Sequence, residues 1–389
     1  MFYVQLLNPI AKQGLDLLGD NFETSNQHPH PDAILVRSSN MHDLEIPPQV
    51  SVVGRAGAGT NNIPIDALSE KGIPVLNTPG ANANAVKELV LAGMLMASRH
   101  LCHAWCAAKN IEANDDKTLN EKVEKQKKQF KGQELPGKQL LVIGLGKIGV
   151  QVANCGTALD MNVTGFDPHI SLENAWHLSS QVNQAQNLED ALRDADFISL
   201  HVPLNDHTRH LIDASKLKHI KPEVILINFA RGPVVDEQAL KQHLDAGALS
   251  GYVSDFPSLL LREHPKVIAL PHLGASTMQA EDNCAKMIAL QVKDYLERGH
   301  IKHSVNFPDM ILGPVINARI SIAHKNKPNM LAQISQVLSH HQCNIIDMLN
   351  KSKGDLAYTL VDFESQLSQE GIRQIEAIDG VLKVRHIVS

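Results

Sequence analysis

The chain has 389 residues, with 36 basic and 42 acidic side chains and a net charge of −6. Apolar residues make up 43% and charged residues 20%, which is enough to build the cores of two or three folded domains. The excess of acidic residues excludes a generally basic nucleic-acid-binding protein, and only 4% of the residues are aromatic, too few for a base-stacking platform.

The five cysteines do not suggest a disulfide framework in a chain of this length. Cys102 and Cys106 lie four apart on an expected helix, where weak metal or redox use stays open beside the simpler interpretation of idle thiols. The first ten residues lack a basic segment and are typical of a strand rather than a signal peptide. The longest apolar stretch, around 89–97, is too short to cross a bilayer, so we expect a cytoplasmic protein without a membrane partner.

The first hundred residues alternate short apolar runs with helical patterns, which favours a parallel sheet with crossover helices. The expected strands are Phe2–Leu6, Ala33–Val36, Ser51–Val53 and Val75–Leu76, and the expected helices are Ile10–Leu18, Pro64–Lys71 and Ala83–Ser98. A charged run over 120–131 follows, and it indicates a solvated helix or connector more than a basic anion site.

A second alternation begins at Gln139. Its expected strands are Gln139–Ile143, Asn162–Phe166, Phe197–Leu200, Val224–Asn228, Gly251–Ser254 and Val267–Leu270, and its expected helices are Ile148–Leu159, Leu188–Arg193 and Glu237–Ala246. A long amphipathic helix over 278–298 ends at Gly299, and the proline-containing segment 300–314 is typical of a linker. The last 75 or so residues predict strand, helix, strand, strand, helix, strand, which is a ferredoxin-like βαββαβ module.

The strongest motif is G-x-G-x-x-G in LLVIGLGKIG, formed by Gly144, Gly146 and Gly149. It follows an apolar strand and opens a helix, which is the context of a dinucleotide-binding loop. Asp167 ends the next strand, eighteen residues after Gly149. A carboxylate there accepts hydrogen bonds from the adenosine ribose and repels a 2′-phosphate, so the sequence predicts NAD rather than NADP.

Two later motifs place chemistry at the ends of expected parallel strands. INFARG supplies Arg231, which can bind a carboxylate through two hydrogen bonds, and PHLGAST supplies His272, which can accept a hydroxyl proton near neutral pH. Strand ends are where open α/β sheets bind their ligands. The remaining histidines show no zinc-binding pattern, so we expect no metal.

These motifs, with GRAGAGTNNIPIDA, NTPGANANAVKE and LHVPLNDHTRHLI, resemble the D-isomer-specific 2-hydroxyacid dehydrogenases, in particular members with a C-terminal ACT domain. The resemblance implies a Rossmann-type doubly wound parallel sheet inserted in a flavodoxin-like substrate domain, plus a small ferredoxin-like ACT domain. The implied limits are 1–97 and 275–308 for the substrate domain, 98–274 for the NAD domain and 316–389 for the ACT-like tail.

The resemblance also implies site residues. Arg231 would bind the substrate's carboxylate and reacting oxygen, and His272 would be the general acid and base. The implied cofactor residues are Gly144, Gly146, Lys147, Ile148, Gly149, Asp167, His201, Val202, Pro203, Thr208, Ala230, Asp255 and Gly274. The implied substrate residues are Arg37, Ala58, Gly59 and Asn82.

One departure from the family concerns the carboxylate that pairs with the catalytic histidine. Where the family has a glutamate, this chain has leucine, near 259–261, and Glu263 lies only nine residues before His272. Asp255 could therefore serve both the nicotinamide and the histidine, or a partner could come from elsewhere.

The tail carries a second implied site. His324, Asn326 and Asn344 match residues that bind L-serine across a pair of ACT domains, although the family glycine before the helix is Asn329 here. These residues could also be simple caps and turns without a ligand. The segment 300–316 would be the hinge of a regulatory movement.

The implied activity is NAD-dependent oxidation of 3-phospho-D-glycerate to 3-phosphohydroxypyruvate, the first step of L-serine synthesis, in a homodimer or homotetramer under serine feedback. Two alternatives stay open. One is a reductase for another 2-oxo acid, such as hydroxypyruvate, glyoxylate or 2-oxoglutarate, and the other is a catalytically silent NAD-sensing protein.

Overall fold

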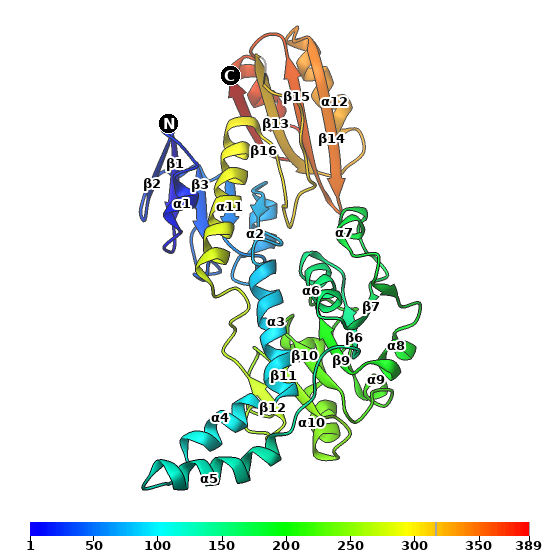
Figure 1. The fold of residues 1–389 in the computed structure, drawn as a ribbon. Helices are drawn as coiled ribbons and strands as arrows, with labels where there is room; N and C mark the ends of the chain where they lie inside the picture. Colours follow the sequence, from blue (N-terminus) through cyan, green and yellow to red (C-terminus); the bar gives the residue numbers. More distant parts are fainter. Residues whose placement is uncertain (316, 389) are drawn as a thin grey trace. The chain divides into compact units, whose positions relative to one another are not determined.

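The structure, a computed structural model, describes residues 1–315 and 317–388 (Figure 1). It divides into two compact units, the first made of residues 1–82 and 278–389 and the second of residues 83–277. The helix α3 (Ala83–Ser98) belongs to the second unit because Val86, Val90 and Met94 pack in the core of its sheet. The domain limits implied by the resemblance stay a prediction beside this division.

The first part of unit one is a five-stranded parallel sheet in the order β2-β1-β3-β4-β5. Its strands are β1 (Phe2–Leu6), β2 (Phe22–Ser25), β3 (Ala33–Val36), β4 (Val52–Arg55) and β5 (Val75–Leu76), with helices α1 (Lys12–Leu15), α2 (Ile65–Glu70) and the long α11 (Met278–Arg298). The sequence missed β2, and α1 is shorter than expected. Gly14 allows α1 to approach α11 closely, since a Cβ there would lie 2.3 Å from the backbone of Ala285.

Unit two is built on a seven-stranded parallel sheet in the order β12-β11-β10-β9-β6-β7-β8. The strands are β6 (Gln139–Ile143), β7 (Asn162–Phe166), β8 (Asn183–Gln184), β9 (Phe197–Leu200), β10 (Ile225–Asn228), β11 (Gly251–Ser254) and β12 (Val267–Ala269). The helices besides α3 are α6 (Lys147–Ala158), α7 (Leu172–His177), α8 (Leu188–Asp194), α9 (Ala214–Leu217), α10 (Glu237–Asp245) and the short turn η2 (Gly232–Val234). The strand order reverses between β6 and β9, which is the switch point of a doubly wound fold.

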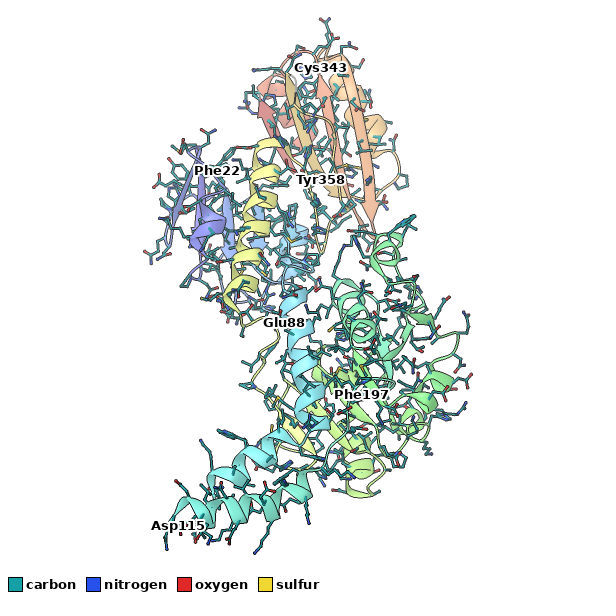
Figure 2. All side chains as sticks on the ribbon, in the orientation of Figure 1. Phe22, Glu88, Asp115, Phe197, Cys343 and Tyr358 are labelled. Carbon is teal, nitrogen blue, oxygen red and sulfur yellow. The ribbon has the colours of Figure 1, made fainter. Side chains whose placement is uncertain are left out.

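A helical hairpin leaves this unit after α3 (Figure 1). It comprises α4 (Leu101–Lys109), α5 (Asp116–Gln126) and the turn η1 (Lys127–Phe130), and none of its residues is buried. Asp115, labelled at its far end in Figure 2, caps α5 by accepting from the Thr118 amide. The expectation of a solvated, charged helix in 120–131 is confirmed.

The tail is the expected βαββαβ module, an antiparallel sheet in the order β14-β15-β13-β16. Its elements are β13 (Ala318–Lys325), α12 (Met330–His340), β14 (Ile345–Lys353), β15 (Leu356–Phe363), α13 (Gln369–Glu376) and β16 (Val381–Val388). One face of the sheet is covered by its own two helices. The other face packs against α11, where Tyr358, labelled in Figure 2, and Leu360 share a core with Tyr295 and Leu296.

The prediction of a linker and hinge at 300–316 is wrong for the part of it that the structure describes. Ile301, Phe307 and Met310 are fully buried, and Ile301 and Met310 pair with each other as a short antiparallel bridge. Ser304 pairs with Leu76, so the segment extends the edge of the first sheet. Its apolar residues enter the shared core instead of connecting two independent bodies; residue 316 lies outside the described residues.

Candidate functional site

The glycine loop adopts the geometry that a bound dinucleotide requires. Gly144 has a φ of +90°, and a Cβ there would collide with the carbonyl of His201 at 2.7 Å. A Cβ on Gly149 would lie 1.9 Å from the Gly144 carbonyl, so only glycine lets α6 pack on the loop. Gly146 precedes α6 and has no protein atom within 4 Å of its Cβ position, which suits a pyrophosphate at the helix N-terminus. Ile148 is the second residue of α6 and lies in its first turn.

Asp167 is the first residue after β7, the neighbour of β6, and its carboxylate reaches back to the glycine loop. Oδ2 accepts a hydrogen bond from the Leu145 amide at 2.8 Å, and Oδ1 accepts one from the His169 amide at 2.9 Å. The carboxylate is therefore fixed beside the loop, as a ribose-binding residue must be. Lys147, the first residue of α6, forms an exposed ion pair with Glu173 at 2.5 Å.

The loop after β9 supplies the next group of cofactor candidates. The His201 amide donates to the carbonyl of Ile143, at the end of β6, and its ring Nε2 lies 2.8 Å from Ser199 Oγ. Burial lowers the pKa of His201 to about 3, so the ring is neutral at physiological pH. Thr208 Oγ1 donates to the Pro203 carbonyl at 2.5 Å and thereby closes the turn that follows Val202.

Arg231, Asp255 and His272 come together in unit two, from the ends of three neighbouring strands. Arg231 follows β10, Asp255 follows β11, and His272 follows β12. The His272 amide donates to the Asp255 carbonyl at 2.9 Å. The charges of His272 and Arg231 both act to lower the pKa of the Asp255 carboxyl, so the three side chains lie near one another. Arg231 and His272 are exposed, and the His272 ring lies against Phe256 at 4.9 Å between ring centroids.

Backbone geometry holds these side chains in place. Arg231 Nη1 donates to the Ala230 carbonyl at 2.6 Å, and Asn228 Nδ2 donates to the Arg231 carbonyl at 2.9 Å. His272 has a φ of +43°, in the left-handed region that only a few per cent of residues other than glycine adopt, with asparagine, aspartate and histidine the most frequent among them. The strained backbone is consistent with a side chain that must point in one direction.

Asp255 is almost completely buried, at 1% exposure. Its Oδ2 accepts from the Gly274 amide at 2.9 Å, whereas its Oδ1 is buried without a hydrogen-bond partner among the described residues. Burial raises the pKa of Asp255, and the Gly274 amide, His272 and Arg231 oppose the shift. The open acceptor fits a carboxamide N–H of nicotinamide, so the residues present fit the cofactor that the glycine loop predicts.

The missing glutamate leaves Asp255 as the carboxylate that interacts with His272. Leu259 is 86% exposed, and Leu261 is buried in the core of unit two. Glu263 is exposed and pairs with Arg262, the adjacent residue. His272 is among the charges that lower the pKa of the Asp255 carboxyl, which places that carboxylate close to the histidine.

The substrate candidates of unit one lie at the carboxyl edge of its parallel sheet. Arg37 follows β3 and forms an ion pair with Glu281 of α11 at 2.5 Å. The Ala58 carbonyl accepts from Asn77 Nδ2 at 2.6 Å, which fixes the loop that includes Gly59. Asn82 Oδ1 is buried without a partner among the described residues, so it is open to a donor from a ligand.

Sequence reasoning missed Arg55, the last residue of β4. A Cβ on Gly57 would lie 2.3 Å from its NH1, so the guanidinium packs directly under the turn that leads to Ala58. Arg55 and Arg37 both interact with the Cys284 thiol, whose pKa is raised chiefly by burial. The signal that could have found Arg55 is its place at the carboxyl end of a parallel strand, the edge where open α/β sheets bind their ligands.

The three regulatory candidates are not brought together within one chain. His324 is buried, with Nδ1 2.8 Å from the Lys325 carbonyl and Nε2 2.9 Å from Thr359 Oγ1. Asn326 donates to the Gly354 carbonyl just beyond the same end of β13. Asn344 precedes β14, which runs antiparallel to β15, and it accepts from Glu364 at the opposite end of the sheet. Asn329 adopts the left-handed φ of 69° that a glycine would adopt.

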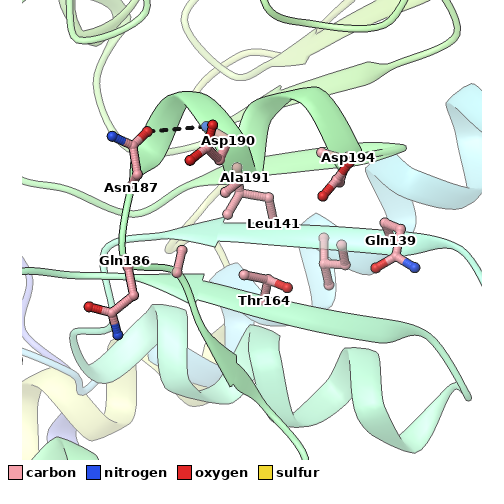
Figure 3. Close-up of a pocket in the computed structure, with 11 residues that line it drawn as sticks. Gln139, Leu141, Thr164, Gln186, Asn187, Asp190, Ala191 and Asp194 are labelled. Carbon is pink, nitrogen blue, oxygen red and sulfur yellow. Dashed lines mark hydrogen bonds between the residues drawn. The ribbon is translucent and has the colours of Figure 1, made fainter.

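A cavity of about 300 Å³ lies between α8 and the strands β6 and β7 (Figure 3). It is lined by Gln139 and Leu141 of β6, Thr164 of β7, and Asp190 and Asp194 of α8. Gln139 is the first residue of β6, whereas the glycine loop follows the last. None of the candidate residues lines this cavity, so it is separate from the candidate site.

Two further findings concern metals and membranes. Within 1–315 and 317–388, no three His, Cys, Asp or Glu side chains are placed to hold a metal ion. All five cysteines are free. No helix in the described part of the chain combines the length and the hydropathy that crossing a membrane requires.

Comparison with known proteins agrees with this geometry. Residues 101–274 match the family described as the D-isomer specific 2-hydroxyacid dehydrogenase, NAD binding domain. The chain is 31% identical over 354 residues to D-3-phosphoglycerate dehydrogenase of Haemophilus influenzae, an alignment that covers 88% of this chain and 82% of that protein. It is 36% identical over 288 residues to the protein of the same name from Methanocaldococcus jannaschii, with 72% of this chain covered. The chain spans about half, 52%, of that second relative.

Solved structures share the fold. The NAD⁺-bound 3-phosphoglycerate dehydrogenase of Entamoeba histolytica aligns with a TM-score of 0.61 and 24% identity, covering 78% of this chain and 98% of that one. D-mandelate dehydrogenase of Rhodotorula graminis aligns with a TM-score of 0.65 and 23% identity, covering 80% and 99%. Together with the Haemophilus alignment, these findings confirm the predicted fold and the NAD-binding domain. The chain belongs to the D-isomer-specific 2-hydroxyacid dehydrogenase family.

Proposed function

We propose that the protein oxidises 3-phospho-D-glycerate at C2 to 3-phosphohydroxypyruvate, with NAD⁺ as the oxidant. The observation that carries the proposal is the convergence of Arg231, Asp255 and His272 beyond three neighbouring strands of an NAD-binding domain. The relatives named D-3-phosphoglycerate dehydrogenase, at 30–36% identity, support this substrate over other 2-hydroxy acids.

In this mechanism the exposed His272 accepts the C2 hydroxyl proton while the C2–H bond breaks. Arg231 binds the substrate carboxylate through two hydrogen bonds and stabilises negative charge on the reacting oxygen. Bound NAD⁺ supplies the hydride acceptor. The Asp255 carboxylate lies close to His272, and its buried Oδ1, which has no partner among the described residues, would accept a hydrogen bond from the nicotinamide carboxamide.

The other candidate residues keep the roles that the family resemblance gives them. Gly144, Gly146, Gly149 and the amides at the start of α6 would hold the pyrophosphate, and Asp167 would bind the ribose. Arg37, the Ala58–Gly59 amides and Asn82 would hold the substrate. Arg55 joins this group, because a second guanidinium near Arg37 suits a substrate with both a carboxylate and a phosphate.

A panel of 2-oxo acids tests the proposal. We expect the purified protein to oxidise NADH fastest with 3-phosphohydroxypyruvate, and more slowly with hydroxypyruvate, glyoxylate and 2-oxoglutarate. If an unphosphorylated acid were reduced faster, that acid would be the substrate, and the proposed hydride transfer and proton transfer would still hold. Tight NADH binding without turnover of any acid would support the silent NAD-sensing alternative.

We also propose that L-serine is an effector and that the protein works in the cytoplasm as a homo-oligomer. Because Asn344 and Asn326 lie at opposite ends of one sheet, a serine site that uses both requires the tails of two chains. The free cysteines suit a reducing compartment.

Inhibition by L-serine, titrated into the intact protein, tests the effector. We expect that Asn326→Ala alone and Asn344→Ala alone each remove the inhibition. Undiminished inhibition in both variants would reject the tail site.

A further inference from the structure

A second cavity, of about 560 Å³, lies within unit one where the tail meets the substrate lobe. The lobe provides Pro48 from the loop before β4, and Lys71 and Ile73 from the turn between α2 and β5. The tail provides Leu382 and Lys383 from β16. Neither the candidate active site nor the regulatory candidates in the tail line this cavity.

The walls of the cavity are held together closely. Gly72 has a φ of +68°, and a Cβ there would lie 2.9 Å from the Cβ atoms of both Leu382 and Lys383. The Lys383 ammonium donates to the carbonyls of Val50 at 2.5 Å and Pro48 at 3.3 Å. The cavity is therefore a preformed feature of the junction between these two parts of the unit.

The charges around the cavity are unbalanced. Burial lowers the pKa of Lys383 to about 8, and the positive charges of Arg385 and Lys71 add to the shift. In the described part of the chain, no carboxylate lies within ion-pair distance of Lys383 or Lys71. Two ammonium groups held near each other at a partly buried surface are stabilised by an anion between them.

The other residues that line the cavity indicate what kind of ligand would fit it. Ile46, Pro48, Ile73, Leu382 and Val384 make most of the wall apolar, and Glu376 contributes the one carboxylate. An inorganic anion would leave this apolar surface in contact with water, whereas an acid with an aliphatic body would cover it.

We propose that this cavity binds a small organic carboxylate with an aliphatic body, whose carboxylate lies between Lys71 and Lys383. The same chemistry could come from a simple aliphatic acid or from an aliphatic amino acid whose ammonium group meets Glu376. The ligand contacts the lobe and the tail at once, and it therefore stabilises their docked arrangement.

Calorimetric titration of the full-length protein, without NAD or substrate, tests the proposal. The probes are 4-methylpentanoate, L-leucine and inorganic phosphate, none of which is a 2-oxo acid. We expect 4-methylpentanoate or L-leucine to bind one site per chain, and Lys71→Glu to weaken that binding at least about tenfold. Lys71 is exposed, so this change leaves the fold intact, and Lys383→Met tests the second ammonium. Lys218→Ala, at an exposed lysine of unit two, is the matched control and should bind normally.

Arg231→Ala separates this site from the active site, because it removes the substrate-binding guanidinium without touching the cavity. Normal binding in this variant supports the proposal, and loss of binding overturns it. The proposal also fails if neither organic probe binds at millimolar concentration, if Lys71→Glu and Lys383→Met both bind normally, or if phosphate binds as tightly as the organic acids. A preference for L-leucine that Glu376→Gln removes identifies an amino acid, and a preference for 4-methylpentanoate identifies a simple acid.

Discussion

Asp167 combines a structural and a recognition role in one carboxylate. Its two oxygens accept from the amides of Leu145 and His169, and Leu145 belongs to the glycine loop. The charge that would exclude a 2′-phosphate is thus also an acceptor that shapes the loop. The two roles can be separated, because asparagine keeps an acceptor oxygen and loses the charge.

We predict that Asp167→Asn and Asp167→Ala both let NADPH compete with NADH, since the repulsion of the 2′-phosphate is lost. Asp167→Ala should lower the free energy of unfolding more than Asp167→Asn does, by about 1 kcal/mol, because alanine leaves the amides of Leu145 and His169 both without an acceptor, whereas asparagine keeps one. Steady-state kinetics with each cofactor and urea unfolding check the two effects. Equal discrimination against NADPH in the unaltered protein and both variants would contradict the role of Asp167.

The role of His272 is best tested by a substitution that tolerates its left-handed backbone conformation. Because its φ is +43°, asparagine tolerates the position better than alanine does. We predict that His272→Asn lowers kcat by about a hundredfold or more while NADH binding, followed by fluorescence, stays unchanged. Near-normal turnover would remove His272 from the mechanism.

The lowered pKa of His201 makes the free energy of unfolding depend on pH. Its pKa is about 3 in the folded protein against 6.5 for an unperturbed histidine, so below pH 6.5 the unfolded chain binds a proton that the folded chain does not. The free energy of unfolding therefore falls as the pH drops from 6.5 toward 3, by up to about 1.4 kcal/mol per pH unit from this residue. Urea unfolding of His201→Gln over this range should show a shallower slope, and parallel slopes would contradict the assignment.

Among the elements, β13 carries a fully buried arginine that joins the tail to the lobe. Arg319 is fully buried and pairs with Asp362 of β15, with Nε 2.5 Å from Oδ1 and Nη2 2.7 Å from Oδ2. Its Nη1 also donates to the carbonyl of Arg298, the last residue of α11, at 2.9 Å. One guanidinium therefore links two tail strands to the long helix of the lobe.

We predict that Arg319→Ala lowers the free energy of unfolding by about 3–5 kcal/mol, because it leaves the buried Asp362 without its partner. The matched control is Arg193→Ala, which breaks the exposed ion pair with Asp190 and should cost less than about 1 kcal/mol. Denaturant unfolding of both variants checks the difference. An equal loss of unfolding free energy in the two variants would show that the buried ion pair of Arg319 stabilises the fold no more than the exposed pair of Arg193 does.

At the scale of the whole molecule, the tail and the lobe share a single core. Tyr358 and Leu360 of the tail pack with Tyr295 and Leu296 of α11, and Arg385 donates to the carbonyls of both α11 residues. A chain that ends near Asn306 would expose this surface to water. Removing the tail is therefore not a neutral way to test regulation.

We predict that the tail unfolds together with the lobe, because neither covers its apolar face alone. A chain truncated after Asn306 should unfold at a lower urea concentration than the full chain, and calorimetry of the full chain should show no separate transition for the tail. An independent low-temperature transition that truncation removes would contradict a shared core.

The sequence by itself determined the local chemistry. Glycine spacing after an apolar strand predicted the dinucleotide loop, and strand-end residues predicted the convergence of Arg231 and His272, because parallel strands bring their carboxyl ends to one edge. The alternation of the tail predicted its βαββαβ order. These features depend on residues close together in the chain, or on a topology that strand order alone fixes.

Only the tertiary structure decided which surfaces cover one another. The two-residue period of β16 places Lys383 and Arg385 on one face, but it cannot say that this face meets the lobe. The period of β13 likewise gave no sign that Arg319 is fully buried, and the prolines of 300–314 suggested a linker where the chain packs into a core. Periodicity shows which residues share a face, whereas the partner of that face depends on segments hundreds of residues away, whose apolar surfaces are complementary only in the folded chain.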